Sequence, residues 1–337
     1  MTSPDPAAVI DLIEAFRRSK TMFAAVCMGV FDLLYEAPAN AAGLAARLNA
    51  NADAMERLLD ACAGLGLLRK RDGVYENDPV ADTYLRTGSP HSLSGYVRYS
   101  DSALYPMWNN LADAVREGSH RWKQTFGLEG PIFSHFFRTG DAMRDFLRGM
   151  HGFGRLTSPK VVTAFDLGRF RHLVDLGGAT GHLAIAACEH YPELRGTVFD
   201  LPPVVETARE HVARSAARDR IDVLAGDFFE DELPPADLYA AGRILHDWND
   251  AQIARLLARI LDRLPAGGGL LVAEKLLAED GVGPVAANMQ SLNMLIATEG
   301  KERSLAEYTR MLQAAGFGPV QGVRTGVPLD AILALKR

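Results

Sequence analysis

Short apolar runs alternate with amphipathic stretches in the second half of the chain. Runs of strand length predict strands over 171–176, 195–200, 221–225, 236–243 and 268–275. Apolar residues at helical spacing predict helices over 181–190, 202–214, 249–264, 285–297 and 304–315. Two final strand patterns, GPVQGVRT and DAILALK, turn at Val327-Pro328 and predict a hairpin. This alternation predicts an α/β fold with a doubly wound, mostly parallel seven-stranded sheet, in which ligands bind beyond the carboxyl ends of the strands.

The segment from Pro6 to about Ala37 also has apolar residues at helical spacing, and it predicts two helices. Its second apolar group, within residues 22–34, covers most of the helix circumference. A helix of this kind is buried either in a core or against another subunit. A dimer interface and an ordinary core helix are both consistent with this pattern.

The next segment follows the order of a winged helix: a helix, a turn, a second helix and a short hairpin closed by an Asp-Gly pair. A winged helix raises the question of DNA binding. The second helix carries Asp53, Glu56 and Asp60 against a single arginine, and these acids repel phosphate. Residues 43–84 contain five basic and seven acidic residues. The sequence therefore predicts a winged-helix domain that does not bind nucleic acid.

Residues 91–165 are predicted to be largely helical and are rich in aromatic residues and methionine. Most of these side chains are expected in the core, which is their usual place. A subset can line a cavity for a flat substrate, namely Tyr99, Trp108, Phe137, Phe146 and Met150. We therefore expect three parts: a helical winged-helix domain (1–90), a helical linker and substrate-pocket segment (91–165) and an α/β domain (166–337).

Composition places the chain among soluble globular proteins. Of its 337 residues 48% are hydrophobic and 23% charged, and the net charge is −6, so affinity for nucleic acid or anionic membranes is not expected. Cys27, Cys62 and Cys188 lie far apart in apolar patterns, and we expect reduced core residues rather than disulfides or a zinc site. No signal-peptide pattern and no apolar segment of about 18 residues is found, which predicts a cytoplasmic protein without a membrane span.

Residues 171–182, RHLVDLGGATGH, predict a strand that turns tightly into a helix. Glycines let the backbone approach a ligand closely, and a helix N-terminus offers unpaired N–H groups, so a nucleotide-sized pocket is expected. The dinucleotide pattern G-x-G-x-x-G is not met, because Ala179 and His182 stand where glycines are needed. Asp175 before the turn and Asp200 after the next strand suit ribose hydroxyls instead.

The turn VDLGGATG resembles motif I of the S-adenosylmethionine (SAM) dependent methyltransferases, D-x-G-G-G-x-G, with Ala179 in place of the third glycine. Together with VFDLP, GDFF, GRILHDWND, AEKLL and TEGKERSLAEY, it resembles the SAM-dependent O-methyltransferases that include acetylserotonin, caffeate and many bacterial antibiotic-pathway enzymes. QSLNMLIATEGKERS is most similar to the acetylserotonin O-methyltransferase-like group. The resemblance covers most of the chain. It implies a Rossmann-like methyltransferase sheet and an N-terminal domain that forms an intertwined homodimer.

The resemblance also implies roles for individual residues. His246 corresponds to the catalytic base, and Glu274 and Glu302 to the two acids that flank and orient it. The residues implied to bind the cofactor are Asp175, Gly177, Gly178 and Gly181 of the turn, Asp200 at the ribose with its neighbour Leu201, Asp227 and Phe228 at the adenine, and Arg243 beside the pocket. The expected substrate residues are Asn293, Trp108, Phe137, Phe146, Met150 and Met289.

The chemistry suits these residue types. A phenolic hydroxyl has a pKa near 10, so reaction through free phenolate alone would cost about 4 kcal/mol near neutral pH. A histidine accepts the proton as the new bond forms, and a carboxylate on its other nitrogen fixes the tautomer. We see no acid cluster like the magnesium site of the other O-methyltransferase class, so no metal is expected. Purely structural roles are alternatives for two of these residues. Glu302 can pair with Lys301 or Arg303 or cap the next helix, and Asp175 can position the turn without binding the cofactor.

The sequence thus predicts an enzyme of secondary metabolism that transfers a methyl group from SAM to a hydroxyl of a small aromatic or polyketide-like molecule and releases S-adenosylhomocysteine. The alternative is a SAM-binding relative that methylates N, S or C, or performs a reaction other than methylation. A winged-helix regulator is a third possibility, which the acidic second helix disfavours. Expected partners are a small-molecule acceptor and a second copy of the chain, bound through the N-terminal helices.

Overall fold

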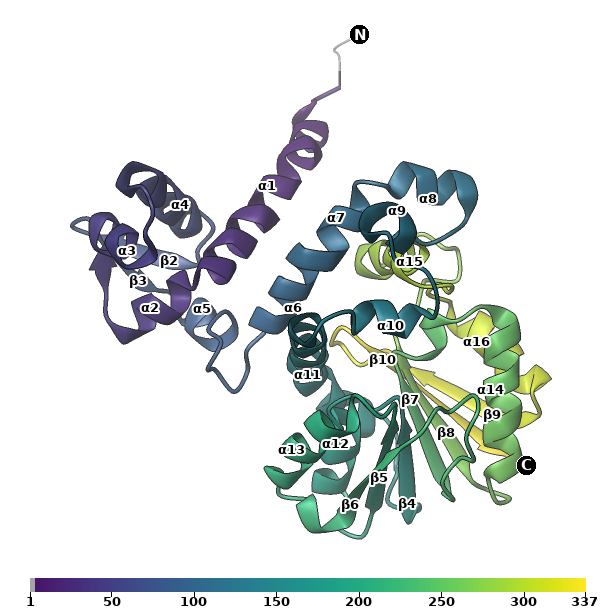
Figure 1. Ribbon diagram of the computed structural model, residues 1–337. Coiled ribbons are helices and arrows are strands. Elements are labelled where there is room, and N and C mark those ends of the chain that lie inside the picture. The colour runs from purple at the N-terminus through teal and green to yellow at the C-terminus, as the bar shows by residue number, and fades with distance from the viewer. Residues whose placement is uncertain (1–3) are drawn as a thin grey trace. The chain divides into compact units, whose positions relative to one another are not determined.

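The computed structural model describes residues 4–337, which divide into two compact units (Figure 1). Unit 1 comprises residues up to 103 together with 144–152, and unit 2 comprises 104–143 together with 153–337. Residues 91–165, expected as a separate segment, are thus shared between the units. The helix Gly140–Val162 contributes to both of them. The division at residues 90 and 165 stays a prediction.

Unit 1 contains helices and a small antiparallel sheet of strand order β1-β3-β2. Its elements are α1 (Ala7–Met28), α2 (Val30–Glu36), β1 (Ala39–Asn40), α3 (Ala41–Leu48), α4 (Ala52–Gly64), β2 (Leu68–Arg71), β3 (Val74–Asn77), α5 (Pro79–Tyr84) and α6 (Ser94–Tyr99), followed by a π-helical turn, Ser100–Leu104. The side chains of Asn40 and Asn51 cap α3 and α4 by accepting backbone N–H groups. The hairpin β2–β3 turns at Asp72 and Gly73, both with positive φ, as the sequence predicted.

The first two helices differ from the expectation. α1 is continuous over 22 residues, and the break comes at Gly29, whose φ of 79° is left-handed. The apolar segment 22–34 packs inside unit 1, where Val26, Val30 and Phe31 are at most 2% exposed. The segment that we expected as a candidate dimer interface is therefore largely core. Most of the large apolar side chains that α1 leaves exposed lie before this segment, namely Val9, Ile10, Leu12, Ile13 and Phe16, and Met28 near the helix end is 36% exposed.

Unit 2 is built on a seven-stranded sheet of order β6-β5-β4-β7-β8-β10-β9. The five strands β6, β5, β4, β7 and β8 are parallel, whereas β10 pairs antiparallel with both β8 and β9. The strands are β4 (His172–Leu176), β5 (Arg195–Asp200), β6 (Ile221–Ala225), β7 (Leu238–Gly242), β8 (Gly269–Glu274), β9 (Phe317–Val323) and β10 (Asp330–Lys336). The predicted doubly wound sheet is confirmed, with its closing hairpin.

Helices cover both faces of this sheet (Figure 1). Alternate strand residues face opposite sides, so Leu173 and Leu271 join the core under α12 and α13, whereas Val174 and Val272 join the core under α14 and α16. The helices of unit 2 are α7 (Tyr105–Trp108), α8 (Leu111–Glu117), α9 (Trp122–Phe126), α10 (Ile132–Phe136), the last part of α11 (Gly140–Val162), α12 (His182–His190), α13 (Val205–Ala213), α14 (Asp250–Arg263), α15 (Val285–Ala297) and α16 (Leu305–Ala314), with 3-10 turns at Arg218–Arg220 and Leu245–Asp247.

One close approach ties α11 to the start of α12. A Cβ on Gly154 would lie 2.2 Å from Cγ of His182, so only glycine fits there. Nδ1 of His182 also lies 2.9 Å from Oγ of Ser158.

Among residues 4–337, none of the helices combines the length and the apolar composition that a membrane crossing needs.

Candidate active site

The glycine turn between β4 and α12 forms a tight cradle. Gly177 and Gly181 have φ of 61° and 75°, in the left-handed region that favours glycine. A Cβ on Gly178 would lie 2.9 Å from Cγ of Asp175, and one on Gly177 would lie 2.5 Å from Cδ1 of Ile244. Ala179 also takes a positive φ, 51°, which costs a residue with a side chain about 1 kcal/mol. The turn holds this conformation despite the missing third glycine.

Asp200 and Asp175 behave differently at this turn. Asp200 ends β5 and is half-buried, and its two oxygens accept the N–H groups of Ala179 and Leu201, each at 2.7 Å. Asp175 is 2% exposed and accepts the N–H of Ala184 at 3.2 Å. Burial raises the pKa of Asp175 to about 7 and that of Asp200 to about 6. Asp175 therefore ties β4 to α12, whereas Asp200 stands at the rim with its neighbour Leu201.

The loop after β6 brings Asp227 and Phe228 to the same end of the sheet. Oδ1 of Asp227 accepts the N–H of Phe229 at 2.8 Å, which fixes the local turn. The ring of Phe228 would lie 3.4 Å from a Cβ on Gly177, so this ring borders the glycine turn. The structure thus brings together the residues expected around the adenine and those expected around the methionine part of the cofactor.

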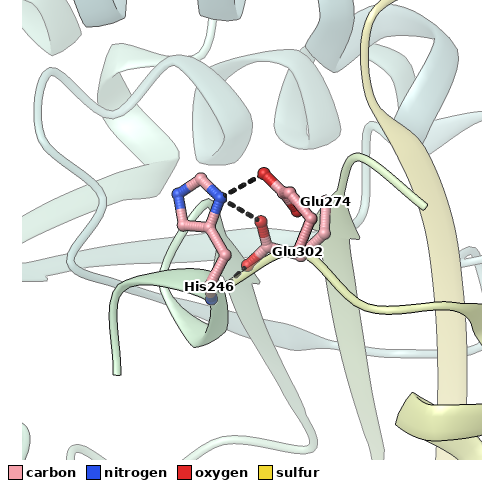
Figure 2. Close-up of side chains that lie close together, drawn as sticks. All are labelled: His246, Glu274 and Glu302. Atoms are coloured by element: carbon pink, nitrogen blue, oxygen red, sulfur yellow. Dashed lines mark hydrogen bonds and ion pairs between the residues drawn. The ribbon is translucent and has the colours of Figure 1, made fainter. Parts of the chain in front are cut away.

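His246 lies in the 3-10 turn after β7 and is 2% exposed. Figure 2 shows its ring with both glutamates on one side: Nδ1 lies 2.7 Å from Oε1 of Glu302 and 3.2 Å from Oε2 of Glu274. The nearest carboxylate oxygen on the other side, Oδ1 of Asp247, is 3.6 Å from Nε2. The hydrogen-bond acceptor Oε1 of Glu302, with the carboxylate of Glu274 close by, favours the tautomer with its proton on Nδ1, so Nε2 of the neutral ring carries the lone pair.

The two glutamates differ in what else they hold. Glu274 ends β8, and its Oε1 accepts the backbone N–H groups of Ile244, Leu245 and His246 at 3.1, 2.9 and 3.3 Å. It therefore anchors the backbone of the turn as well as the ring. Glu302 comes from the loop before α16 and is 1% exposed. The sequence alternative in which Glu302 pairs with Lys301 or Arg303 is not found, because its carboxylate contacts the histidine.

Electrostatics at this cluster favours a proton on the histidine. Burial lowers the pKa of His246, but the charges of Glu274, Glu302 and Asp247 raise it by more, to about 9. Burial in turn raises the pKa of Glu274 to about 8 and that of Asp247 to about 6. Because the three acids surround one imidazole, a proton that reaches Nε2 is strongly stabilised.

One histidine and two glutamates also resemble a metal site, since one ligand atom from each lies within 4.8 Å of the others. Two ligands on one tetrahedral zinc ion, each about 2.1 Å from the metal, lie roughly 3.4 Å apart. The 2.7 Å between Nδ1 of His246 and Oε1 of Glu302 is shorter and fits a charge-assisted hydrogen bond. The donor set thus fits a histidine held by acids better than a metal centre.

Gly300 was not among the residues predicted for the site, and it brings the Glu302 loop against the base. A Cβ on Gly300 would lie 2.1 Å from the carbonyl oxygen of His246 and 2.7 Å from N of Trp248. The N–H of Glu299 also donates to the carbonyl of Asp247 at 3.1 Å. The signal was present in the sequence as the glycine of TEGKERS, but the close approach joins segments that are distant along the chain.

The expected substrate residues fall into three groups. Trp108 and Asn293 are joined, since Nε1 of the indole donates to Oδ1 of Asn293 at 3.0 Å, and Met289 lies one turn earlier on α15 with 46% of its surface exposed. Phe137 is half-buried against Phe133, with ring centroids 6.4 Å apart.

Phe146 and Met150 belong to unit 1, where both are half-buried and the ring of Phe146 lies 5.3 Å from that of Tyr99. Their role at a substrate stays a prediction.

Arg243, with φ of 58°, places its guanidinium 4.9 Å from the ring centroid of Phe153.

Comparison with known families explains this arrangement. Residues 108–318 match the O-methyltransferase domain, and residues 10–87 match the O-methyltransferase dimerisation domain. The chain belongs to the O-methyltransferase family. The resemblance predicted from the motifs is thereby confirmed, and the N-terminal part of this family member is a dimerisation domain.

Individual relatives agree over nearly the whole chain. Acetylserotonin O-methyltransferase of Gallus gallus is 42% identical over 338 residues, which cover 98% of this chain and 97% of the relative. A human probable bifunctional dTTP/UTP pyrophosphatase/methyltransferase protein is also 42% identical, over 99% of this chain, but the chain spans only 54% of that relative. The crystal structure of human N-acetylserotonin methyltransferase in complex with SAM superimposes with a TM-score of 0.94 at 41% identity, and covers 100% of this chain and 99% of the other.

Proposed function

We propose that this O-methyltransferase transfers a methyl group from SAM to a hydroxyl of a small aromatic molecule, with His246 as the general base. The observation that carries the proposal is the arrangement at the ring: two buried glutamates hold Nδ1, which leaves Nε2 as the proton acceptor. A histidine that served only the fold would have no need of two buried acids at one nitrogen, because each buried charge is unfavourable unless it is paired.

The glycine turn and the acids around it fit SAM. The backbone of Gly177, Gly178 and Gly181 can lie close to the methionine part, since a Cβ at each position would meet a neighbour within 2.9 Å. Asp200 would accept ribose hydroxyls, and Asp227 and Phe228 would contact the adenine. When bound, SAM supplies an electrophilic methyl group on a sulfonium. Asp175 positions the turn, and Arg243 would lie beside the cofactor.

His246 would take the proton from the acceptor hydroxyl at Nε2 as the oxygen becomes nucleophilic. Glu302 and Glu274 then stabilise the imidazolium, and Glu274 also keeps the backbone of the turn in place. General base catalysis of this kind contributes roughly 10²–10⁴ in rate. The proton afterwards leaves to solvent, and S-adenosylhomocysteine is released.

Asn293, Trp108 and Met289 would meet the acceptor, since they lie together at α15. Phe137 completes the proposed set in unit 2, and a substrate role for Phe146 and Met150 of unit 1 stays a prediction from the sequence. We infer that the acceptor is an aromatic or polyketide-like compound of secondary metabolism and that the enzyme acts in the cytoplasm. The family domain at residues 10–87 supports a homodimer in which the winged-helix domain serves association. The exposed apolar side chains of α1 are the part of that domain that needs a partner.

The deciding experiment incubates the protein with methyl-labelled SAM and N-acetylserotonin, the acceptor named for the relatives, and then with a panel of plain phenols and extracts of its own organism. Mass spectrometry identifies the product and the methylated atom. A methyl ether supports the proposal. Label on nitrogen, sulfur or carbon alone, or a protein that does not bind SAM, contradicts it.

A further inference from the structure

Arg303 directly follows Glu302, and none of the roles above uses it. The residue is only 2% exposed, although its guanidinium carries a full charge. A buried charge is unfavourable unless hydrogen bonds and an opposite charge compensate it. Within residues 4–337 the guanidinium has one carboxylate oxygen within 4.0 Å, Oδ1 of Asp250 at 2.6 Å from Nη2. Its other hydrogen bonds go to backbone carbonyls, which identify what the side chain holds together.

The guanidinium lies between the segment that carries the base and the segment that carries its carboxylate partner. Nη1 donates to the carbonyl of Lys301 at 3.0 Å and, at the longer distance of 3.4 Å, to the carbonyl of Leu245. Nη2 donates to the carbonyl of Trp248, also at 3.4 Å. Lys301 immediately precedes Glu302, whereas Leu245 and Trp248 lie on either side of His246. One planar group with donors in a fixed fork therefore connects the loop to the 3-10 turn.

The backbone of the loop has anchors of its own. The carbonyl of Arg303 accepts the N–H of Leu277, three residues after Glu274, at 3.0 Å. Ser304 then begins α16 with a capping box that it forms with Glu307. These contacts do not involve the guanidinium, so we expect the loop to keep its fold when the side chain is replaced. What the guanidinium adds is a fixed spacing between the loop and the turn.

This spacing determines the contact between Nδ1 of His246 and Oε1 of Glu302, which are 2.7 Å apart. A hydrogen bond weakens when it is stretched beyond about 3.2 Å, and the attraction between charges also falls with distance. Both the charge of Glu302 and its hydrogen bond raise the pKa of His246. A loop that moved away from the turn would therefore lower this pKa and leave the ring less well fixed.

We propose that Arg303 is a positioning residue, whose guanidinium holds the Glu302 loop against the His246 turn and so keeps the base in contact with its carboxylate partner. This inference deepens the proposed methyl transfer and rests on it, because it concerns the base of that reaction. Arg303 itself acts through Glu302 and contacts neither the acceptor nor the cofactor. Lysine cannot replace it, because a single ammonium group does not offer the fork that reaches carbonyls on both segments.

The charge of Arg303 and its geometry predict opposite changes in the pKa of His246. Loss of a nearby cation alone would raise this pKa, because a cation repels the imidazolium. Loss of the fixed spacing would lower it, because Glu302 would lie farther from Nδ1. Arg303→Lys keeps the charge and removes the fork. A lower pKa in this variant is therefore specific to positioning.

The experiment measures the pKa of His246 by NMR titration of protein labelled with carbon-13 at histidine Cε1. The resonance is assigned by its absence in His246→Ala, and no acceptor is needed. The wild-type pKa should be about 9, and Arg303→Lys should have a lower value. With the acceptor that the labelled SAM identifies, kcat of Arg303→Lys should fall by about 10- to 100-fold, as expected when a reacting group is displaced by about 1 Å. Its affinity for S-adenosylhomocysteine should be unchanged.

Arg220→Met is the matched control. The guanidinium of Arg220 also donates to three backbone carbonyls, those of Cys188, Tyr191 and Leu194. These residues precede β5, whereas Asp200 of the site lies at the other end of that strand. Arg220→Met should therefore lower the stability of unit 2 without changing the pKa of His246 or kcat.

An unchanged or raised pKa of His246 in Arg303→Lys overturns the proposal, as does an unchanged kcat. An equal fall of the pKa in Arg220→Met also overturns it, because the effect would then reflect general loosening. Circular dichroism checks that each variant is folded, and Arg303→Met takes the place of an unfolded Arg303→Lys under the same criteria. Failure of the proposed function is distinguishable, because the wild-type protein would then transfer no methyl group while the NMR titration would still report on the contact.

Discussion

Nδ1 of His246 lies 2.7 Å from Oε1 of Glu302, and neither residue is more than 2% exposed. A hydrogen bond this short and this buried fixes the ring, because water does not compete for either atom. The other nitrogen, Nε2, is thereby held in one direction. Its position decides where an acceptor hydroxyl has to lie in order to lose its proton.

Replacing the base should separate chemistry from binding. His246→Ala should lower kcat by roughly 10²–10⁴, because it removes the proton acceptor. The affinity for S-adenosylhomocysteine should change little, since the proposed cofactor residues lie on the glycine turn and after β5 and β6. Single-turnover kinetics and calorimetry measure the two quantities. Near-wild-type transfer by His246→Ala at neutral pH would show that proximity alone drives the reaction.

The raised pKa of His246 predicts a specific pH profile. Only the neutral imidazole accepts a proton, so kcat should rise with pH until it passes the histidine pKa of about 9. Glu302→Gln removes one of the charges that raise this pKa, and the midpoint should move to lower pH. Its plateau should also fall, because the imidazolium is less stabilised. A midpoint that is the same in both proteins would mean that another group titrates.

Asp200 should matter more than Asp175 for SAM. Asp200→Ala removes a charged acceptor at the rim and should weaken binding by about 1.5–3 kcal/mol. Asp175→Asn keeps an oxygen for the N–H of Ala184 and should weaken binding less. Because burial raises the pKa of Asp200 to about 6, affinity in the wild-type protein should decline as the pH falls through that value. Titration calorimetry over this pH range tests both statements, and wild-type affinity in Asp200→Ala would place the ribose elsewhere.

Gly300→Ala should lower kcat by displacing the Glu302 loop, although Gly300 is not among the residues proposed to contact the substrate. Its Cβ would collide with the carbonyl oxygen of His246 and N of Trp248, so the loop that carries Glu302 has to move away from the base. We expect a fall in kcat together with a lower midpoint of the pH profile, because Glu302 no longer raises the histidine pKa as strongly. Gly88→Ala is the control, since a Cβ there meets nothing within 4 Å. Equal kcat and equal midpoints in both variants would contradict this account.

Association should depend on the start of α1. Ile13 is 64% exposed and lies among four other exposed apolar residues of that helix. Ile13→Asp should shift light scattering from a dimer toward the 36.6 kDa monomer, because a charge in an apolar interface is unfavourable. Arg17→Asp is a control that alters charge at an already polar position of the same helix. A wild-type protein that is monomeric at micromolar concentration would rule out the dimer.

Much of unit 2 was predictable from local pattern. The strand before the glycine turn, the turn itself and the position of Asp200 at the end of the next strand follow from apolar periodicity and glycine spacing, and the structure has all three. His246 lies in the 3-10 turn after β7, and its role came from the resemblance to a family. The pairing of Glu302 with His246 joins positions 56 residues apart. Periodicity says nothing about such a pair, and it came from the resemblance to a family.

Other features depend on packing that no local pattern records. α1 runs without a break from the first apolar group into the second and ends only at Gly29, which takes a left-handed φ of 79°. Segment 22–34 was consistent with either a dimer interface or a core helix, and its own unit buries most of it. Gly300 gains its importance only from neighbours on another segment. Which aromatic side chains meet a substrate is likewise set by tertiary contacts.

The contact between Gly154 and His182 limits how this lineage can change. Any side chain at position 154 would overlap the imidazole. Substitution of Gly154 is therefore excluded as long as position 182 holds an aromatic ring. A smaller residue at position 182 would make room for a side chain at position 154. We therefore expect the residues at these two positions to change together in related sequences. His182 begins α12 directly after the glycine turn. A substitution on α11, which is distant from the glycine turn in sequence, can therefore determine which residues are tolerated at the end of that turn.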